Sequence, residues 1–191
     1  MFMKVIKSLF LLIARILGRI FYDPEYLRGR YFGNNLRGWI WVVRTAPLKL
    51  IGYNLKSPWP VDHSCEVTNY NNIIFDVDDM HIFHRRGTYF QCTNAKIIIG
   101  KGTQIAYGVG LITENHDLCD ITKHQPGKDI RIGKSCWIGM NAVLLPGIIL
   151  GDHTVVGAGS VVTKSFPDGY VVVAGNPAKV IKTLNKADCV D

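Results

Sequence analysis

The sequence predicts an all-β core folded as a parallel β-helix of short strands, preceded by amphipathic helices and followed by a short helix. Three observations predict this core: a six-residue repeat, a small residue at a fixed place in each repeat, and short apolar runs punctuated by Gly, Asn, Asp and Thr. In the repeat, glycine directly follows an apolar residue at positions 132–133, 138–139, 150–151 and 156–157.

The repeat extends over residues 97–166. Its apolar positions are Ile99, Ile105, Leu111, Ile132, Ile138, Leu144, Leu150, Val156 and Val162. Small residues follow four positions later at Thr103, Val109, Cys136, Ala142, Thr154 and Ser160. A six-residue step fits neither the 3.6-residue turn of a helix nor the two-residue alternation of a strand.

Each hexad is therefore interpreted as one side of a coil, with one inward apolar residue and a bend where glycine relieves backbone strain. Three sides make a coil of about eighteen residues, and stacked coils pair in parallel, so that Ile138 lies over Val156 and Leu144 over Val162. A β-sandwich is disfavoured, because sandwich strands are spaced less regularly and alternate with a period of two. The repeat does not give the handedness of the coil.

Composition and spacing predict three regions in this chain of 191 residues. Residues 1–60 form a basic helical segment, residues 61–176 the β-helix with a loop at 116–130, and residues 177–191 a helix and tail. The five cysteines form no CxxC pair, which indicates reduced thiols in a cytosolic protein and neither a disulfide framework nor a zinc knuckle.

The net charge of +7 is unevenly distributed: residues 1–60 carry +8 and residues 61–191 carry −1. Basic residues mixed with Phe, Trp, Leu and Ile suit a lipid surface better than a nucleic acid. No zinc finger, RNA-recognition signature or basic-heptad pattern supports nucleic-acid binding.

The first 22 residues have a helical pattern with Lys4, Lys7, Arg15 and Arg19 on one face and apolar residues elsewhere. The longest uncharged run, 8–14, is far shorter than the ~20 residues that a membrane span needs, and no signal-peptide cleavage site follows it. We expect this helix to lie in the membrane interface at the cytoplasmic face. The alternative is packing on the protein's own core or on a neighbouring subunit.

The segment after this helix contains a second helix signal and two tryptophans. Asp23 and Pro24 resemble the N-cap and first residue of a second short helix. Trp39 and Trp41 suit the belt of aromatic residues at a membrane interface.

A loop interrupts the repeat between Leu111 and Ile132, which are 21 residues apart, three more than one coil. His116 stands at its start, and a histidine can act as general base near neutral pH. The alternative is a solvated loop histidine. Asp117 or a backbone carbonyl could orient the far ring nitrogen of His116. His124 is a bystander or an acceptor contact, and His153 at a turn position is expected to face solvent.

The segments "IGMNAV", "LGDHTV" and "VGAGSV", with the closing "VVTKSFPDGYVVVAGNPAKVIK", resemble the hexapeptide-repeat acyltransferases. The resemblance is to the branch of galactoside, maltose and xenobiotic O-acetyltransferases and of sugar acetyltransferases of surface-polysaccharide clusters. It covers residues 90–184 well, and residues 1–60 lie outside it. It implies a left-handed coil, a homotrimer and acetyl-CoA bound in a groove between two subunits.

The resemblance also assigns residues to roles. "LITENHD" maps His116 onto the general base. Trp137, Met140 and Ala158 would line the pantetheine arm, Thr163 and Lys164 lie at the last bend, and Lys179 and Lys182 would meet the CoA phosphates. In the predicted C-terminal helix these two lysines share one face. Acceptor contacts are expected from Gln91, Asn94 and Asn115.

The predicted function is acetyl transfer from acetyl-CoA to a saccharide hydroxyl, directly and without a covalent enzyme intermediate. The basic N-terminal segment favours a lipid-linked saccharide or a surface-polysaccharide precursor. Three alternatives remain: a small-molecule or xenobiotic acetyltransferase, an amino-sugar N-acetyltransferase, and a non-enzymatic or metal-binding scaffold. The histidines lack the spacing that a metal site between subunits needs, so no metal is expected.

Overall fold

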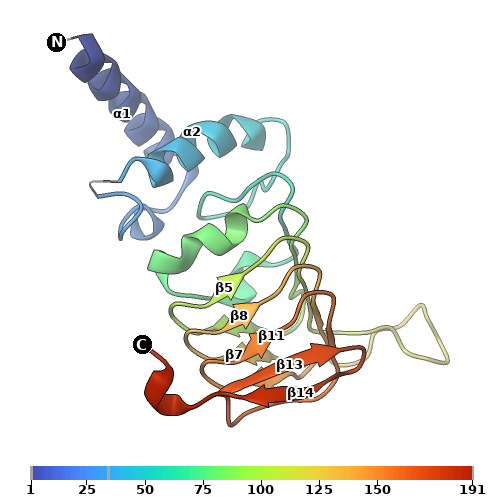
Figure 1. Cartoon of the computed structure of the whole chain (residues 1–191). Helices are drawn as coiled ribbons and strands as arrows, with labels where there is room; N and C mark the ends of the chain where they lie inside the picture. The colour runs from blue at the N-terminus through green and yellow to red at the C-terminus, as the bar shows by residue number, and fades with distance from the viewer. Residues whose placement is uncertain (1, 34, 191) are drawn as a thin grey trace. The chain divides into compact units, whose positions relative to one another are not determined.

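The computed structural model describes residues 2–33 and 35–190 of the chain (Figure 1), which divides into two compact units, Met1–His63 and Ser64–Asp191. The first unit contains the helices α1 (Phe2–Phe21) and α2 (Arg37–Lys49), with the 3-10 turn η1 (Pro24–Tyr26) between them in sequence. The second short helix expected after Asp23 is therefore only this one turn. No helix among the described residues is long and apolar enough to cross a membrane.

Small and aromatic residues hold α1 against α2. A Cβ on Gly18 would lie 3.4 Å from the ring of Trp39, so the glycine allows the close approach of the tryptophan. The hydroxyls of Tyr22 and Thr45 form a buried hydrogen bond of 2.7 Å. Lys49 donates from Nζ to the carbonyls of Phe21 and Ser57, and burial lowers the pKa of its amine. These contacts use one side of α1 and leave another side free.

The second unit is built from three sheets, here called A, B and C, whose neighbouring strands pair in parallel except at the last pair of sheet C. Sheet A has the order β1 (Glu66–Val67), β3 (Tyr89–Gln91), β6 (Gly110–Ile112), β9 (Val143–Leu144), β12 (Val161–Val162). Sheet B has the order β10 (Ile149–Leu150), β7 (Ile130–Ile132), β4 (Ile97–Ile99), β2 (Ile73–Ile74). Sheet C has the order β14 (Ala178–Thr183), β13 (Val171–Gly175), β11 (Val155–Val156), β8 (Trp137–Ile138), β5 (Gln104–Ile105).

Three 3-10 segments complete the second unit. They are η2 (Tyr70–Asn72), η3 (Val77–His84) and η4 (Lys186–Asp188).

From β4 to β12 the chain visits sheets B, C and A in turn, which is the three-sided coil predicted from the hexads. Ile138 pairs with Val156 and Leu144 with Val162, as expected. All nine apolar positions of the repeat are at most 4% exposed, and the small residues four positions later are at most 1% exposed. The parallel β-helix is therefore confirmed.

The glycines of the repeat have a different role from the one predicted. The bends with positive φ lie two positions further on, at Ser135, Asn141 and His153 among others, so these glycines do not relieve strain there. Instead, a Cβ on Gly139 would lie 2.6 Å from the backbone nitrogen of Ala158 in the next coil. Glycine is needed because adjacent coils approach too closely for any side chain.

The loop is longer than the spacing suggested. Leu111 and Ile132 lie on consecutive sides of the coil, in β6 and β7. Ile105 pairs with Ile138, 33 residues later, whereas Ile138 pairs with Val156, 18 residues later. The loop therefore adds 15 residues to its coil, not three.

The predicted C-terminal helix over 177–191 is wrong. β14 returns antiparallel along β13, and within residues 177–190 the only helical turn is η4. The β-branched Val180 and Ile181 favour a strand, and the polar backbone edge of β13 provides a partner for it. Figure 1 shows this hairpin covering the last edge of sheet C, opposite β5.

Candidate functional site

The loop between β6 and β7 folds back on itself as a two-stranded arm. Its backbone hydrogen bonds join Lys128 to Thr113, Gln125 to Asn115, and Asp117 to Lys123. His116 and His124 form a bridge within this ladder, and their ring centroids are 4.2 Å apart. Both side chains are exposed. Backbone pairing thus brings the two loop histidines, eight positions apart in sequence, side by side.

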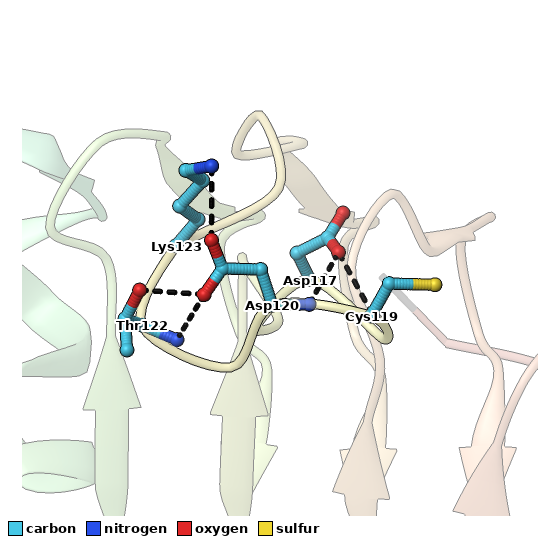
Figure 2. A network of polar contacts seen from close by, with 5 residues as sticks. All are labelled: Asp117, Cys119, Asp120, Thr122 and Lys123. Atoms are coloured by element: carbon cyan, nitrogen blue, oxygen red, sulfur yellow. Dashed lines mark hydrogen bonds and ion pairs between the residues drawn. The ribbon is translucent and has the colours of Figure 1, made fainter.

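Figure 2 shows the tip of the arm, where two aspartates hold the turn. The carboxylate of Asp117 accepts from the backbone nitrogens of Cys119 and Asp120 at 2.9 and 3.0 Å. The carboxylate of Asp120 accepts from the hydroxyl of Thr122 at 2.6 Å and pairs with Lys123 at 2.9 Å. Hydrogen bonds to their carboxylates lower the pKa of both aspartates. The carboxylate of Asp117 therefore stabilises the turn.

The far nitrogen of His116 is held by a backbone carbonyl, the second of the two groups expected to orient it. Nδ1 lies 2.8 Å from the carbonyl oxygen of Ile121. Since a carbonyl oxygen can only accept, Nδ1 carries the proton and donates it to this bond. In the neutral ring Nε2 then holds the free lone pair, which is the form that a general base requires.

A polar cluster at the base of the arm was not found by sequence reasoning. Glu114 is 6% exposed, and its two carboxylate oxygens accept from Gln91 Nε2 at 2.7 Å and Asn94 Nδ2 at 2.8 Å. The Oε1 of Gln91 accepts in turn from the backbone nitrogen of Thr113 at 2.9 Å. The structure thus uses two of the three expected acceptor residues to hold Glu114, and Asn115 next to it is exposed. The only sequence signal was an acidic residue two positions after an apolar strand.

Changing Glu114 to Gln should lower the free energy of unfolding by about 1.5–3 kcal/mol, the usual contribution of one hydrogen bond to a charged group. A carboxylate accepts on both oxygens, whereas an amide would present its own donor to either Gln91 or Asn94. Urea unfolding measures the change, with Glu66→Gln as control because Glu66 is exposed on β1. Equal stability of the two variants would show that the cluster does not hold the arm.

The residues expected along the pantetheine arm lie on and beside sheet C. Trp137 is on β8 and is 57% exposed. Met140 and Ala158 follow β8 and β11 one coil apart, and both are exposed. The structure therefore places these three residues on the outside of neighbouring coils, where a long ligand could contact them. Thr163 and Lys164, directly after β12, are also exposed.

The two lysines expected at the CoA phosphates lie on β14. Lys182 pairs with Val172 and Lys179 with Ala174, and the register shifts between Val172 and Val173. Because Val172 and Ala174 are two residues apart, they share a face of the sheet, and so do the lysines opposite them. A β-bulge therefore places Lys179 and Lys182 on one face of the sheet, as the predicted helix would have placed them on one helical face. Both lysines are exposed.

The two buried thiols Cys92 and Cys136, and His153, are not arranged for catalysis. Burial raises the pKa of the Cys92 thiol and raises that of Cys136 to about 11, so neither is a thiolate near neutral pH. His153 was expected to face solvent, but it is 8% exposed and stacks on Tyr170 with ring centroids 4.9 Å apart. Within residues 2–33 and 35–190, no three His, Cys, Asp or Glu side chains lie close enough to hold a metal ion.

The fold and site define a class: a parallel β-helix of hexapeptide repeats that carries a histidine arm at one coil corner. The chain belongs to the hexapeptide-repeat acetyltransferase family. The family described as bacterial transferase hexapeptide (six repeats) matches residues 129–164. The candidate acetyltransferase YJL218W of Saccharomyces cerevisiae is 38% identical over 190 residues, which cover 87% of this chain and 88% of that protein.

Other relatives match a smaller part of their own length. The galactoside O-acetyltransferase of Escherichia coli K12 is 38% identical over 99 residues, and the match covers 48% of this chain and 46% of that enzyme. A solved galactoside acetyltransferase in complex with coenzyme A is 27% identical, with a TM-score of 0.47 over 65% of this chain and 64% of that one. The chain thus matches about half of the first enzyme and under two thirds of the second.

Proposed function

We propose that this protein transfers the acetyl group of acetyl-CoA directly to a saccharide hydroxyl, with His116 as general base. The observation that carries the proposal is the hydrogen bond from Nδ1 of His116 to the Ile121 carbonyl, which leaves Nε2 as the basic nitrogen. Family membership supports the acetyl donor, and the galactoside O-acetyltransferase among the relatives supports a sugar hydroxyl as acceptor.

The proposed reaction is a single acyl transfer. The acceptor hydroxyl oxygen attacks the thioester carbonyl carbon while Nε2 of His116 takes the hydroxyl proton. The carbon–sulfur bond then breaks, and the proton passes from the imidazolium to the departing CoA sulfur. No covalent enzyme intermediate is needed, because a thioester is already electrophilic. The high pKa values of the buried Cys92 and Cys136 agree with this path.

The positions of the site residues support a homotrimer. The arm with His116 leaves the coil between β6 of sheet A and β7 of sheet B, whereas Trp137 and Lys182 lie on sheet C. On a three-sided coil these are different parts of the outer surface. A second copy of the chain would bring its arm to the coenzyme on sheet C. In a closed ring of three copies, every coenzyme site would receive the arm of a neighbouring copy.

Acetyl-CoA turnover over a panel of saccharides tests the function, with CoA release as the readout. The panel includes neutral sugars, amino sugars and chloramphenicol as a xenobiotic. Acetylation of a sugar hydroxyl, located by NMR of the product, supports the proposal. Acetylation only of amines or of the xenobiotic would replace it with one of the alternative functions.

We further propose that α1 attaches the protein to the cytoplasmic membrane surface, where a lipid-linked acceptor would be found. Its free side carries apolar residues that are 46–66% exposed: Val5, Leu9, Leu12, Ile13, Ile16 and Ile20. Lys4, Lys7, Arg15 and Arg19 are exposed beside this stripe, and the helix contains no acidic residue. An exposed apolar stripe flanked by cations suits an interface with anionic lipids.

Vesicle sedimentation tests the attachment. The full chain should bind vesicles that contain anionic lipid, and binding should weaken in high salt. Leu9→Glu combined with Ile16→Glu should lower the partition coefficient about 100-fold or more, because each of the two buried side chains contributes about a factor of ten. Leu55→Glu is the control, since Leu55 is 62% exposed but lies outside α1. A protein lacking residues 1–22 that still sediments with vesicles would overturn the attachment.

A further inference from the structure

A cavity of about 370 Å³ lies over β5 and β8, at the edge of sheet C that is remote from the C-terminal hairpin. Its lining residues are Arg85, Gln104, Ile105, Ala106, Tyr107 and Trp137. Its volume falls within the range of about 300–1,000 Å³ that small-molecule sites occupy. Of these residues, only Trp137 is among those expected to contact the coenzyme.

Two aromatic rings border this cavity and remain open to solvent. Trp137 is 57% exposed and Tyr107 is 47% exposed, although aromatic side chains of this size usually bury much of their surface. Such rings offer an apolar face together with a polar edge. A sugar ring, which has apolar C–H faces and polar hydroxyl edges, has the complementary chemistry.

The third side of the cavity carries the guanidinium of Arg85, which no carboxylate of the described residues neutralises. The Cζ of Arg85 lies 5.6 Å from the ring centroid of Tyr107. Arg85 takes part in none of the ion pairs formed among residues 2–33 and 35–190. Gln104 beside it is fixed by a 2.8 Å hydrogen bond between its Oε1 and Nε2 of His81. The planar guanidinium fork is therefore available for a carboxylate or phosphate.

Position distinguishes this cavity from the phosphate end of the proposed coenzyme site. Lys179 and Lys182 on β14 are three strand steps from β8, and at about 4.8 Å a step this is ~14 Å. A coenzyme whose phosphates meet these lysines would extend along β13 and β11, with its thioester towards Trp137. The cavity then lies beyond the thioester, where the acceptor has to be.

We propose that this cavity binds the acceptor and that Arg85 selects a saccharide bearing an anionic substituent. The inference rests on the proposed function, because it takes the coenzyme to lie along sheet C. The sugar ring stacks against Trp137 or Tyr107, and the anionic group receives hydrogen bonds from Arg85. Both a carboxylate of an acidic sugar and a phosphate ester fit this chemistry.

Kinetics with three derivatives of one acceptor sugar test the proposal. They are the neutral methyl galactoside, its 6-carboxylate and its 6-phosphate. We expect kcat/KM for at least one anionic acceptor to exceed that for the neutral one about tenfold or more, and the two anions distinguish carboxylate from phosphate selection. Arg85→Gln should remove this preference, with a loss of about 10- to 100-fold for the anion. The KM for acetyl-CoA should not change.

A control variant and a separate binding measurement distinguish a change in acceptor selectivity from a loss of folding and from a change in coenzyme binding. Arg86→Gln is the control variant, since Arg86 is adjacent and exposed but does not line the cavity. Quenching of tryptophan fluorescence by the anionic sugar measures binding apart from turnover, and Arg85→Gln should weaken that binding about 10- to 100-fold. A rise in the KM for acetyl-CoA would assign the cavity to the coenzyme and overturn the proposal, as would equal rates with neutral and anionic sugars. Absence of transfer to every saccharide would instead refute the proposed function.

Discussion

Replacing His116 with Ala should lower the turnover of acetyl-CoA with a saccharide acceptor about 100-fold or more, the usual effect of removing a general base. The affinity for acetyl-CoA should remain the same, because His116 is exposed on the arm and in the proposed mechanism acts on the acceptor hydroxyl rather than on the coenzyme chain. Single-turnover kinetics measure the first effect and calorimetric titration with CoA the second. Loss of both together would indicate a displaced arm.

His124→Ala is the matched control for this experiment. Its ring lies against that of His116, with centroids 4.2 Å apart and planes tilted by 41°, but no side-chain hydrogen bond to a backbone carbonyl fixes its tautomer within the described part of the chain. We expect its turnover to fall less than about tenfold, since only the packing of His116 changes. If His124→Ala loses as much activity as His116→Ala, the role of base belongs to the pair or to His124.

The second large effect concerns stability. Gly139→Ala should lower the free energy of unfolding of the coil region by about 3 kcal/mol, at the upper end of the cost of overpacking. The added Cβ would lie 2.6 Å from both the nitrogen of Ala158 and the carbonyl oxygen of Val156. Backbone atoms cannot rotate away as a side chain can, so neighbouring coils must separate. Urea unfolding measures the change.

Gly110→Ala provides the comparison within the same unit. A Cβ at Gly110 would come no closer than 3.7 Å to any heavy atom, the distance of ordinary van der Waals contact. Its stability should stay within about 0.5–1 kcal/mol of the parent protein, with any gain coming from a less flexible unfolded chain. Equal destabilisation by the two substitutions would show that coil spacing is not the reason for glycine at 139.

The coil itself could be predicted from the sequence because each of its sides repeats the same physical requirement. Every sixth residue points inward, so Ile138 and Leu144 had to be apolar and Ala142 had to be small. The reason for glycine at 139 was misjudged because the sequence shows only neighbours along the chain. The constraint comes from Ala158, 19 positions later, across the stacking direction.

The candidate site could be predicted only in part, because its hydrogen bonds depend on backbone placement. His116 was identified from its position at the start of the loop, but the carbonyl of Ile121 faces it only once the arm has folded. Glu114 gains its amide partner Gln91 through the pairing of β3 with β6, which no local pattern indicates. The spacing of Lys179 and Lys182 fits a helix, and only the register of β14 reveals the bulge.

The hairpin of β13 and β14 has a consequence for solubility. A stack of parallel coils ends in an open strand edge, to which another molecule could add its own coil and so begin a fibre. Here β14 reverses the chain direction at that edge of sheet C and presents Lys179 and Lys182 outward. An incoming parallel strand would meet a mismatched chain direction there, so the hairpin protects this edge of sheet C from edge-to-edge aggregation.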